Sequence, residues 1–226
     1  KRELGKPKKH YNKREVWIAL IDLDAIGQAL WPPRMPTGSL CTGKGYARAA
    51  GMSLIIRLLC RRPFRQRNIR EMQIDKNIYK TTEGIWMISF VGEALKIEQK
   101  NGEENDFELP FPTDLVPQLE TYLSTWRPLL GGLSPHLFLN IDGKPFYSES
   151  TFNAAFGRPI YSHTGKRFHP HLVRTVWATE YIKETHDFYG AAIMLNDTLD
   201  AVIKNYAEVL DEGTARKADE WLQSKI

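Results

Sequence analysis

Cysteine is scarce in this chain of 226 residues, which has only Cys41 and Cys60. Two cysteines cannot build a disulfide framework, and neither lies in a C-x-x-C or Cys/His pattern, so no structural zinc or other metal site is expected. A low cysteine content is typical of proteins in a reducing compartment. We therefore expect an intracellular, cytoplasmic protein.

Long apolar runs are also missing. None approaches the roughly 20 residues that a membrane-spanning helix needs, so no membrane partner is expected. The first residues, KRELGKPKKHYNKR, lack the apolar core of a signal peptide. Because 42% of the residues are hydrophobic and 26% charged, the chain can bury a core as one moderate domain or two small ones. The absence of an initiator methionine suggests a fragment of a longer protein.

Acidic residues are missing from one stretch and scarce in another, although the net charge of the whole chain is only +4. The first fourteen residues contain seven lysines and arginines against one glutamate, and Arg57 to Arg70 contains six arginines and no acidic residue. Such runs raise the local positive potential and attract polyanions, above all nucleic acid. The alternative for the first fourteen residues is a solvated linker.

Hydrophobic spacing predicts a mainly α-helical protein with a small antiparallel β-sheet, an α+β fold. The expected helices span residues 14–30, 46–61, 66–72, 114–130, 168–185, 188–196, 198–210 and 215–226. Prolines and glycines between Trp31 and Gly45 predict a loop. Residues 85–90 and 107–111 are strand-like, and NGEEN at 101–105 predicts a turn between them.

The predicted helix 168–185 carries a histidine and an arginine three residues apart. Residues at this spacing lie side by side on a helix, about 5–6 Å apart, so the polar ends of His171 and Arg174 can converge on one small target. The structural alternative is that Arg174 is a surface arginine and that His171 bonds nearby backbone at the start of the helix.

The stretch H-L-V-R-T-V-W-A-T, His171 to Thr179, resembles the second signature of the tyrosine recombinase (phage integrase) family, H-x-x-R followed by a small residue and threonine. Members of that family place a histidine or tryptophan about twenty-three residues after the arginine, in a short L-G-H-like turn. Their nucleophilic tyrosine follows about nine residues later. This chain has Leu195 to Asp197 and Tyr206 at those distances.

An upstream stretch, RQRNIREM, resembles the segment that carries the family's first catalytic arginine, R-x-x-E/N-[IL]-x-x-[LM]. The matching residues are Arg65, Asn68, Ile69 and Met72. The family's catalytic lysine lies in the small sheet that comes next. There Lys96 is the first choice, because it directly follows the first strand, and Lys100 is its rival.

The similarity runs from about Tyr46 to Leu210. It implies the tyrosine recombinase catalytic-domain fold for residues 46–226, ending in a helical tail, with a basic linker and an N-terminal helix in residues 1–45. The family's separate N-terminal DNA-clamping domain is not recognisable, as expected of a fragment cut in the linker.

The resemblance implies strand breakage and rejoining in DNA, with no metal, ATP or other cofactor. Arg65 and Arg174 would bind the scissile phosphate, because a guanidinium is permanently charged and can bind phosphate through two parallel hydrogen bonds. Lys96 would protonate the leaving 5′ oxygen, and His171 would orient the nucleophile or accept a proton near it. Tyr206 would attack and form a 3′-phosphotyrosyl link.

Asp197 departs from the family pattern, which has a histidine or tryptophan donating a hydrogen bond to a phosphate oxygen. An ionised carboxylate cannot donate, and at 4 Å it would repel a phosphate charge by roughly 4 kcal/mol at an effective dielectric constant of about 20. We expect Asp197 to brace one of the arginines. The alternatives are that burial keeps it protonated, that His169 supplies the missing donor, or that it caps a helix beginning at Thr198 or Leu199.

Tyr206 also has a structural alternative. It shares a helical stripe with Leu199, Val202 and Ile203, and a tyrosine among aliphatic residues is usually part of a core, with its hydroxyl bonded to one partner. The order and the intervals of the arginines, lysine, histidine and tyrosine favour the catalytic interpretation.

Double-stranded DNA is the partner that the resemblance implies. The basic residues expected to contact it are Arg61, Arg62, Arg67, Lys100, Lys166 and Arg167. We expect a monomer alone and a homotetramer on DNA. The last helix, with Trp221 and Leu222 as anchors, would dock on a neighbouring subunit or fold back on its own domain.

The favoured function is therefore a site-specific DNA recombinase or integrase. Two alternatives stay open. One is a DNA-binding relative that has lost catalysis, for which Asp197 is the motive, and the other is an enzyme like the type IB topoisomerases.

Overall fold

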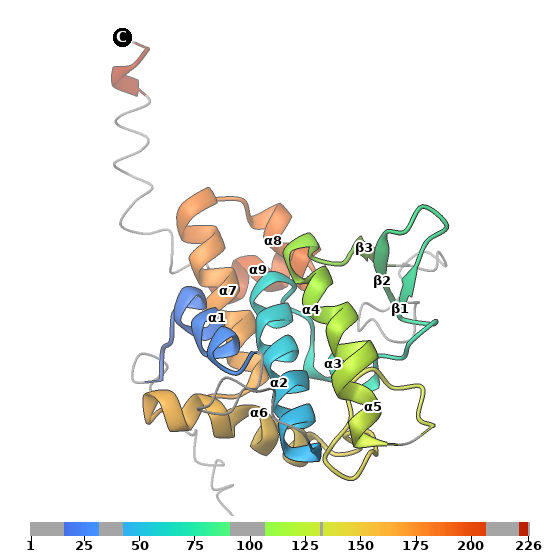
Figure 1. Cartoon of the computed structure of the whole chain (residues 1–226). Helices are drawn as coiled ribbons and strands as arrows, with labels where there is room; N and C mark the ends of the chain where they lie inside the picture. The colour runs from blue at the N-terminus through green and yellow to red at the C-terminus, as the bar shows by residue number, and fades with distance from the viewer. Residues whose placement is uncertain (1–15, 32–42, 91–106, 132, 207–221, 226) are drawn as a thin grey trace, which may run out of the picture.

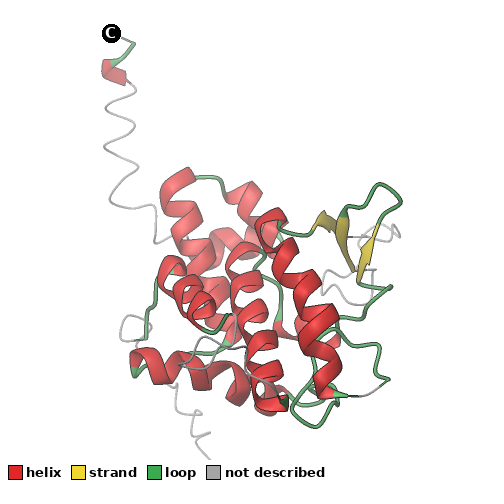
Figure 2. Ribbon diagram, viewed as in Figure 1, coloured by secondary structure: helices red, strands yellow, loops and turns green. Residues whose placement is uncertain are grey.

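The computed structural model describes residues 16–31, 43–90, 107–131, 133–206 and 222–225. Within them, helices pack around a central helix, α2, and a small sheet lies at one side of the helical body (Figure 1). Figure 2 shows the same division between helices and strands. The helices are α1 (Leu20–Ala29), α2 (Lys44–Arg61), α3 (Gln66–Glu71), α4 (Val116–Thr121), α5 (Arg127–Leu130), α6 (Glu149–Thr164), α7 (Pro170–Thr185), α8 (Phe188–Leu195) and α9 (Leu199–Tyr206). A 3-10 turn, η2 (Thr113–Leu115), precedes α4, and a π-helical stretch, η3 (Tyr122–Trp126), joins α4 to α5.

Helix α2 is covered on all sides. Seven consecutive residues, Ala50 to Ile56, are buried, which is the pattern of a helix in the middle of a core. Gly51 makes one close approach possible, since a Cβ at this position would lie 3.0 Å from the hydroxyl oxygen of the buried Tyr122 in η3. In the described residues, no helix is both long and apolar enough to cross a bilayer.

The sheet contains β1 (Ile78–Lys80), β2 (Trp86–Phe90) and β3 (Phe107–Pro110), antiparallel and in that order. Ile88, at the centre of β2, pairs with Ile78 on one side and Leu109 on the other. The expected strands β2 and β3 are confirmed. The sequence did not predict β1, because three residues are too few to show a period of two.

Two lysines of the predicted site cannot be placed on this sheet. Lys96 and Lys100, the candidates for the general acid, belong to residues 91–106 and lie outside the described residues. Their assignment stays a prediction.

Helix α6 was not expected from the sequence. Its interior contains Gly157 and Pro159, both of which are unfavourable in helices. The helix forms because Ser148 caps its start, accepting a hydrogen bond from the backbone of Thr151, and because Phe152 and other apolar residues on one face are buried. A Cβ at position 157 would lie 2.9 Å from the backbone oxygen of Phe168, so glycine also lets the chain that leads into α7 pack closely.

Helix α1 belongs to the same core as α2. It begins at Leu20, six residues later than the apolar spacing suggested, and buries Leu23 and Ile26. The domain boundary predicted at residue 45 stays a prediction. Helix α1, which lies before that boundary, packs into the same apolar core as the helices that follow it. The terminal segment 222–225 forms a short turn in which Leu222 is exposed, and Trp221 lies outside the described residues.

A second apolar cluster joins the C-terminal helices. It consists of Trp177, Ala178, Ile182, Ala191, Ala192, Leu195 and Val202. These residues come from α7, α8 and α9, so their packing fixes the helix that ends at Tyr206 against the helix that carries Arg174.

Candidate active site

Arg65 stands at the turn between α2 and α3. It is the residue that precedes α3 and its backbone is extended, because Pro63 ends the preceding helical segment. Phe64 anchors the turn on the sheet through edge-to-face contacts with Phe90 and Phe107, at ring-centroid distances of 5.3 and 6.0 Å. The Arg65 side chain retains 22% exposure, so it is held at the surface of the core and can still meet a ligand.

Arg174, on α7, is buried, with 6% of its surface exposed. Its Nη1 donates to the backbone oxygen of Pro63, and its Nη2 donates to the backbone oxygen of Leu195 at 2.9 Å. Burial lowers the pKa of Arg174 to about 10, the charge of Arg65 acts in the same direction, and Asp197 opposes both. The guanidinium is therefore still charged at neutral pH. Through its two bonds to backbone oxygens, the Arg174 side chain links the turn that carries Arg65 to the C-terminal end of α8.

Asp197 brings the two arginines together. Its Oδ2 lies 3.5 Å from Nη2 of Arg65 and 3.4 Å from Nη2 of Arg174. The side chain is 36% exposed, so this shared carboxylate lies at the mouth of the site rather than inside the core. If Asp197 braces the arginines, as expected from the sequence, its carboxylate must contact them, and it contacts both Arg65 and Arg174.

The turn before Asp197 explains its position. Asn196 adopts the left-handed conformation, with φ 47°, at the place where the L-G-H-like turn of the recombinases has glycine, and asparagine tolerates that conformation better than most residues. The alternative that Asp197 caps α9 is wrong. The cap is Thr198, whose Oγ1 accepts a hydrogen bond from the backbone of Ala201 at 3.2 Å.

Tyr206 is half-buried at the end of α9 and packs against the second apolar cluster. Burial raises the pKa of its phenol, whereas a hydrogen bond with the Thr175 side chain and the charge of Arg174 lower it, and the charge of Asp197 raises it again. The phenol therefore lies within electrostatic reach of Arg174 and Asp197.

The stripe that includes Tyr206 is only partly buried. Val202 is 1% exposed, but Leu199 and Ile203 are 40% and 44% exposed. The structural alternative, in which the tyrosine fills a core, stays open, because Tyr206 itself packs against the second apolar cluster.

Two histidines lie at the start of α7. The rings of His169 and His171 are parallel, with centroids 6.3 Å apart. Burial and the neighbouring His171 lower the pKa of His169, while Glu149 raises it. His171 is exposed and lies one helical turn before Arg174, on the same face of α7. A proton-accepting role for His171 and a donor role for His169 stay predictions.

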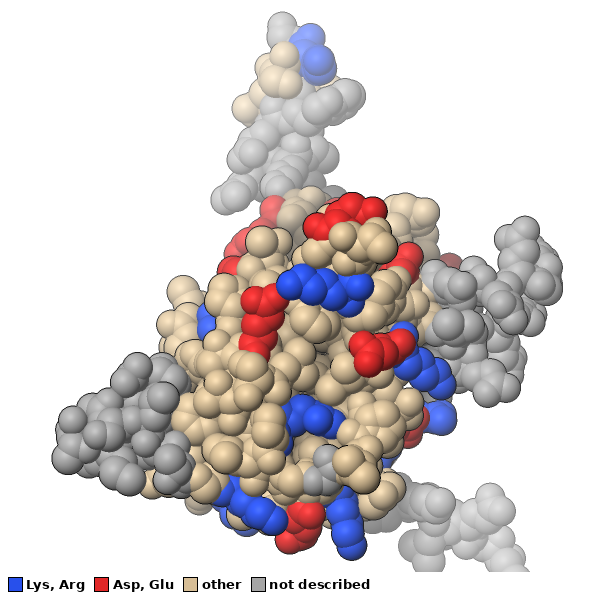
Figure 3. Space-filling model, turned by 45° about the vertical axis from the view of Figure 1, so that its right-hand side comes forward, with Lys and Arg blue, Asp and Glu red and all other residues tan. Residues whose placement is uncertain are grey.

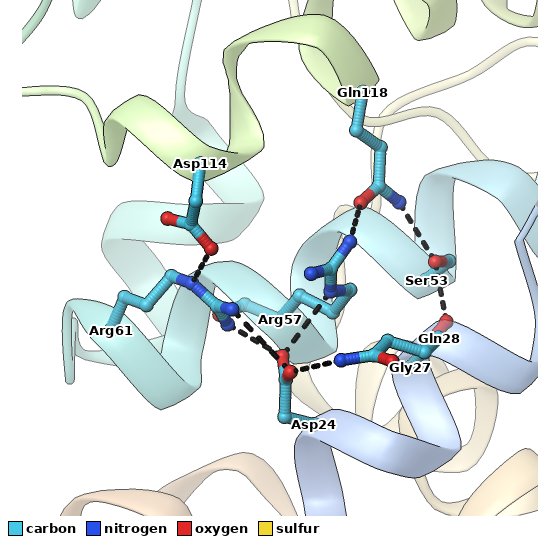
Figure 4. Close-up of polar contacts among 8 residues, drawn as sticks. All are labelled: Asp24, Gly27, Gln28, Ser53, Arg57, Arg61, Asp114 and Gln118. Carbon is cyan, nitrogen blue, oxygen red and sulfur yellow. Dashed lines mark hydrogen bonds and ion pairs between the residues drawn. The ribbon is translucent and has the colours of Figure 1, made fainter.

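The arginine run has mostly internal partners. Arg57 and Arg61 turn towards Asp24 of α1, and Arg61 also donates to Asp114 at 2.7 Å (Figure 4). Gln118 accepts a hydrogen bond from Arg57 at 2.6 Å and continues the same network. The basic run that the sequence suggested as a polyanion-binding surface is therefore in large part an ion-pair framework within the fold.

The other predicted DNA-binding residues lie in different settings. Arg62 donates to the backbone oxygen of Pro110 at 3.3 Å, and Arg67 pairs with Glu71 on the surface. Lys166 donates to the backbone oxygen of Trp17, and Arg167 is exposed.

On the face drawn in Figure 3, basic and acidic side chains alternate instead of gathering into one basic area. DNA contacts by Arg61, Arg62, Arg67, Lys166 and Arg167 stay predictions.

Sequence reasoning missed Thr175. Its side chain lowers the pKa of Tyr206, yet the pattern H-x-x-R drew attention only to His171 and Arg174. The available signal was its position four residues after His171, which places it on the same helical face.

Comparisons with known proteins support the fold. No family model and no curated protein matches the chain. Among solved structures, it resembles the XerH site-specific recombinase in a pre-cleavage complex with its difH substrate, with 16% identity and a TM-score of 0.57. It also resembles XerH in a post-cleavage complex with a palindromic difH substrate, with 17% identity and a TM-score of 0.59. The XerA recombinase aligns with 12% identity and a TM-score of 0.56.

The aligned regions cover 90% of this chain and 52% of each XerH chain, and 98% of this chain and 67% of XerA. The chain thus spans about half the length of the XerH structures. At these identities the likeness concerns the fold. The predicted fold class, mainly α with a small antiparallel sheet as in the tyrosine recombinase catalytic domain, is confirmed.

Proposed function

We propose that this chain is a site-specific DNA recombinase or integrase that cleaves and rejoins DNA strands through a 3′-phosphotyrosyl intermediate. The observation that carries the proposal is the convergence of Arg65 and Arg174 on one carboxylate oxygen, with the Tyr206 phenol in electrostatic reach. Two guanidiniums that share an anionic oxygen are suited to share the oxygens of a phosphodiester. The recombinase fold supports the same conclusion.

The proposed reaction is an exchange of phosphate esters. The phenolic oxygen of Tyr206 forms a bond to phosphorus while the bond from phosphorus to the 5′ oxygen breaks. The two arginines stabilise the negative charge that builds up on the non-bridging oxygens. Lys96 gives a proton to the departing 5′ oxygen. The reverse attack by a 5′ hydroxyl of another strand completes the exchange without ATP, because the phosphotyrosyl link preserves the ester energy.

The nucleophile needs help to lose its proton. Because burial raises the pKa of Tyr206, the phenol is protonated in the free protein at neutral pH. His171 is exposed on the same face of α7 as Arg174, and in this mechanism it accepts the phenolic proton. Arg174 assists by attracting the phenolate as it forms.

The proposed partner is double-stranded DNA, on which four copies assemble while the free protein is a monomer. The XerH structures are complexes of a recombinase with its substrate before and after cleavage, and the shared fold supports the same kind of partner here. The C-terminal tail would contribute to assembly.

One observation favours a second function, a DNA-binding relative that has lost catalysis. Asp197 already lies within 3.5 Å of both arginines, so a phosphate entering the site meets a carboxylate that competes for the same guanidiniums. An Asp197 that never moves aside would allow DNA binding elsewhere on the chain and prevent cleavage.

A suicide-substrate experiment separates these functions. A pool of nicked duplexes with randomised sequence is incubated with the protein, and covalent protein–DNA adducts are separated under denaturing conditions. Adducts that disappear in Tyr206→Phe support the recombinase, whereas tight binding without any adduct across the pool supports the binding protein. Relaxation of a supercoiled plasmid without strand exchange between duplexes would instead favour the topoisomerase-like alternative.

A further inference from the structure

Three consecutive residues of the turn before α3 contact three different parts of the candidate site. The backbone oxygen of Pro63 accepts a hydrogen bond from Arg174 of α7. Arg65 pairs with Asp197, in the turn that follows α8, at 3.5 Å. Between them, Phe64 is buried against the sheet, with 6% of its surface exposed. Neighbouring residues of one turn thus reach α7, the chain after α8 and the sheet.

The contact of Phe64 with the sheet lies at one pair of opposite strand residues. Its ring meets the rings of Phe90 and Phe107 edge to face, at interplanar angles of 72° and 88°. Phe90 is the last residue of β2, Phe107 is the first residue of β3, and the two are paired across the antiparallel strands. Aromatic rings prefer such edge-to-face arrangements. Phe64 therefore holds both strands at the position where β2 ends and β3 begins.

These two strands matter for the proposed reaction because of what lies between them in the sequence. Lys96 and Lys100, the candidates for the general acid, come after β2 and before β3. The phosphate-binding Arg65 directly follows Phe64. One aromatic side chain therefore fixes the turn that carries the arginine relative to the strands on either side of the general-acid candidates. Such placement matters for rate, since a shift of about 1 Å in a reacting group can cost about 100-fold.

We propose that Phe64 is a positioning residue that couples the phosphate-binding arginine to the general acid, by locking the turn before Arg65 onto the paired ends of β2 and β3. The inference rests on the proposed function, in which Arg65 binds the scissile phosphate and a lysine protonates the departing 5′ oxygen. The Phe64 ring belongs to the apolar core, so it acts through these two groups and not through a contact with DNA.

The test compares Phe64→Leu with Phe146→Leu. Phe146 is the matched control, because it is also buried, at 4% exposure, and its ring meets the Phe152 ring edge to face at 5.3 Å and 74°. The partner of Phe146 lies on α6 instead of the sheet. Both substitutions remove an aromatic ring from the core, so both should lower the melting temperature. Only Phe64→Leu should alter the chemistry.

The rate of adduct formation is measured with two saturating suicide substrates that differ in one atom. The 5′ leaving atom at the scissile phosphate is oxygen in the first substrate and sulfur in the second. Breaking the phosphorus–sulfur bond releases a thiolate, which leaves without being protonated because a thiol is a far stronger acid than an alcohol. The sulfur substrate does not need the general acid, so the comparison isolates the contribution of the lysine.

Phe64→Leu should slow adduct formation about tenfold or more with the oxygen substrate and about threefold or less with the sulfur substrate. Its DNA dissociation constant should stay within about threefold of the parent value, because most DNA contacts are made elsewhere. Phe146→Leu should react like the parent with both substrates. The inference is overturned if Phe64→Leu reacts like the parent, if it is slowed by the same factor with both substrates, or if Phe146→Leu is slowed equally.

A second variant removes the ring on the other side of the contact. Phe107 is only partly buried, so Phe107→Leu should disturb the core less than Phe64→Leu and can be measured even if Phe64→Leu does not fold. It should show the same substrate dependence, with a larger loss of rate for the oxygen substrate than for the sulfur substrate. Equal losses with the two substrates would contradict the coupling.

A measurement on the free protein keeps this inference separate from the proposed function. If the parent forms no adduct that depends on Tyr206, the proposed function fails, but hydrogen exchange still reports whether Phe64 holds the strands. In Phe64→Leu, exchange of the backbone amides of β2 and β3 should accelerate more than that of the α6 amides, and Phe146→Leu should show the reverse. Equal acceleration in the strands and in α6 would refute the role of the Phe64 contact.

Discussion

Replacing Asp24 by asparagine should test the polar network that attaches α1 to α2. Its carboxylate contacts Nε of Arg57 at 3.2 Å and also pairs with Nη1 of Arg61, and Gln28 donates to it at 2.7 Å (Figure 4). Side-chain exposures of 15% for Arg57, 23% for Arg61 and 17% for Asp24 show that water reaches the group only partly. Asp24→Asn removes the negative charge and leaves two arginines facing each other.

The expected cost follows from this burial. Breaking a fully buried ion pair by removing one partner costs about 3–5 kcal/mol. Because these side chains keep some exposure, we expect a loss of about 2–3 kcal/mol in the free energy of unfolding at pH 7. For a chain of this size, about 1 kcal/mol corresponds to roughly 2–4 °C, so the melting temperature should fall by about 5–10 °C.

The effect should depend on pH in a defined direction. Burial alone would raise the pKa of Asp24, but hydrogen bonds from Arg61 and Gln28 and the charges of both arginines outweigh it, and the pKa lies below the ordinary value of 3.8. A carboxyl group whose pKa is lowered by folding stabilises the fold above its unfolded pKa and loses that contribution as the pH falls through its folded pKa. The difference between parent and Asp24→Asn should therefore be full at pH 6 to 7 and shrink in acid below about pH 4.

Urea unfolding at several pH values measures this difference, and Asp114→Asn is the control. Asp114 also pairs with Arg61, but its side chain is 55% exposed, so its replacement should cost less than about 1 kcal/mol. Equal losses in the two variants, or a loss at Asp24 that does not shrink in acid, would refute the assignment of a buried, charge-dependent network. No loss at all would show that α1 is not held through Asp24.

Three further outcomes are expected. Asp197→Asn should slow adduct formation about tenfold, because the two arginines lose the carboxylate that orients them; a large gain in cleavage would show that the charge was harmful. Arg174→Lys should slow it by about 100-fold or more and lower the melting temperature, because an ammonium on a flexible stem cannot reproduce a guanidinium bonded to two backbone oxygens and a carboxylate; an active and stable lysine variant would contradict this. Burial raises the pKa of Glu180 above 4.5, and a carboxyl group whose pKa is raised by folding loses stability as the pH rises through that pKa. The stability of Glu180→Gln, measured by urea unfolding, should therefore fall less than that of the parent between about pH 4.5 and 7, and identical pH profiles would contradict this.

The sequence by itself determined the helical character and the order of the candidate site. Apolar residues at helical spacing located α2, α7, α8 and α9, because a helix must bury one face and this requirement is written in local periodicity. Of the residues that the spacing placed in one site, Arg174 and Asp197 are in contact in the structure, and the catalytic role of Tyr206 stays a prediction. In the stretch Leu195 to Asp197, which the resemblance places in a short turn, Asn196 adopts a left-handed backbone that few residues accept.

Tertiary structure alone decided how the charged residues are used. The sequence showed six arginines in a stretch, Arg57 to Arg70, that contains no acidic residue, but the acids that pair with Arg57 and Arg61 come from α1 and from the turn before α4, up to 53 residues away. Arg174 binds backbone oxygens 111 and 21 residues away, and any residue type can supply such an oxygen. Local spacing fixes which face of a helix is apolar, but an ion pair or hydrogen bond between distant segments depends on where the folded chain places both ends.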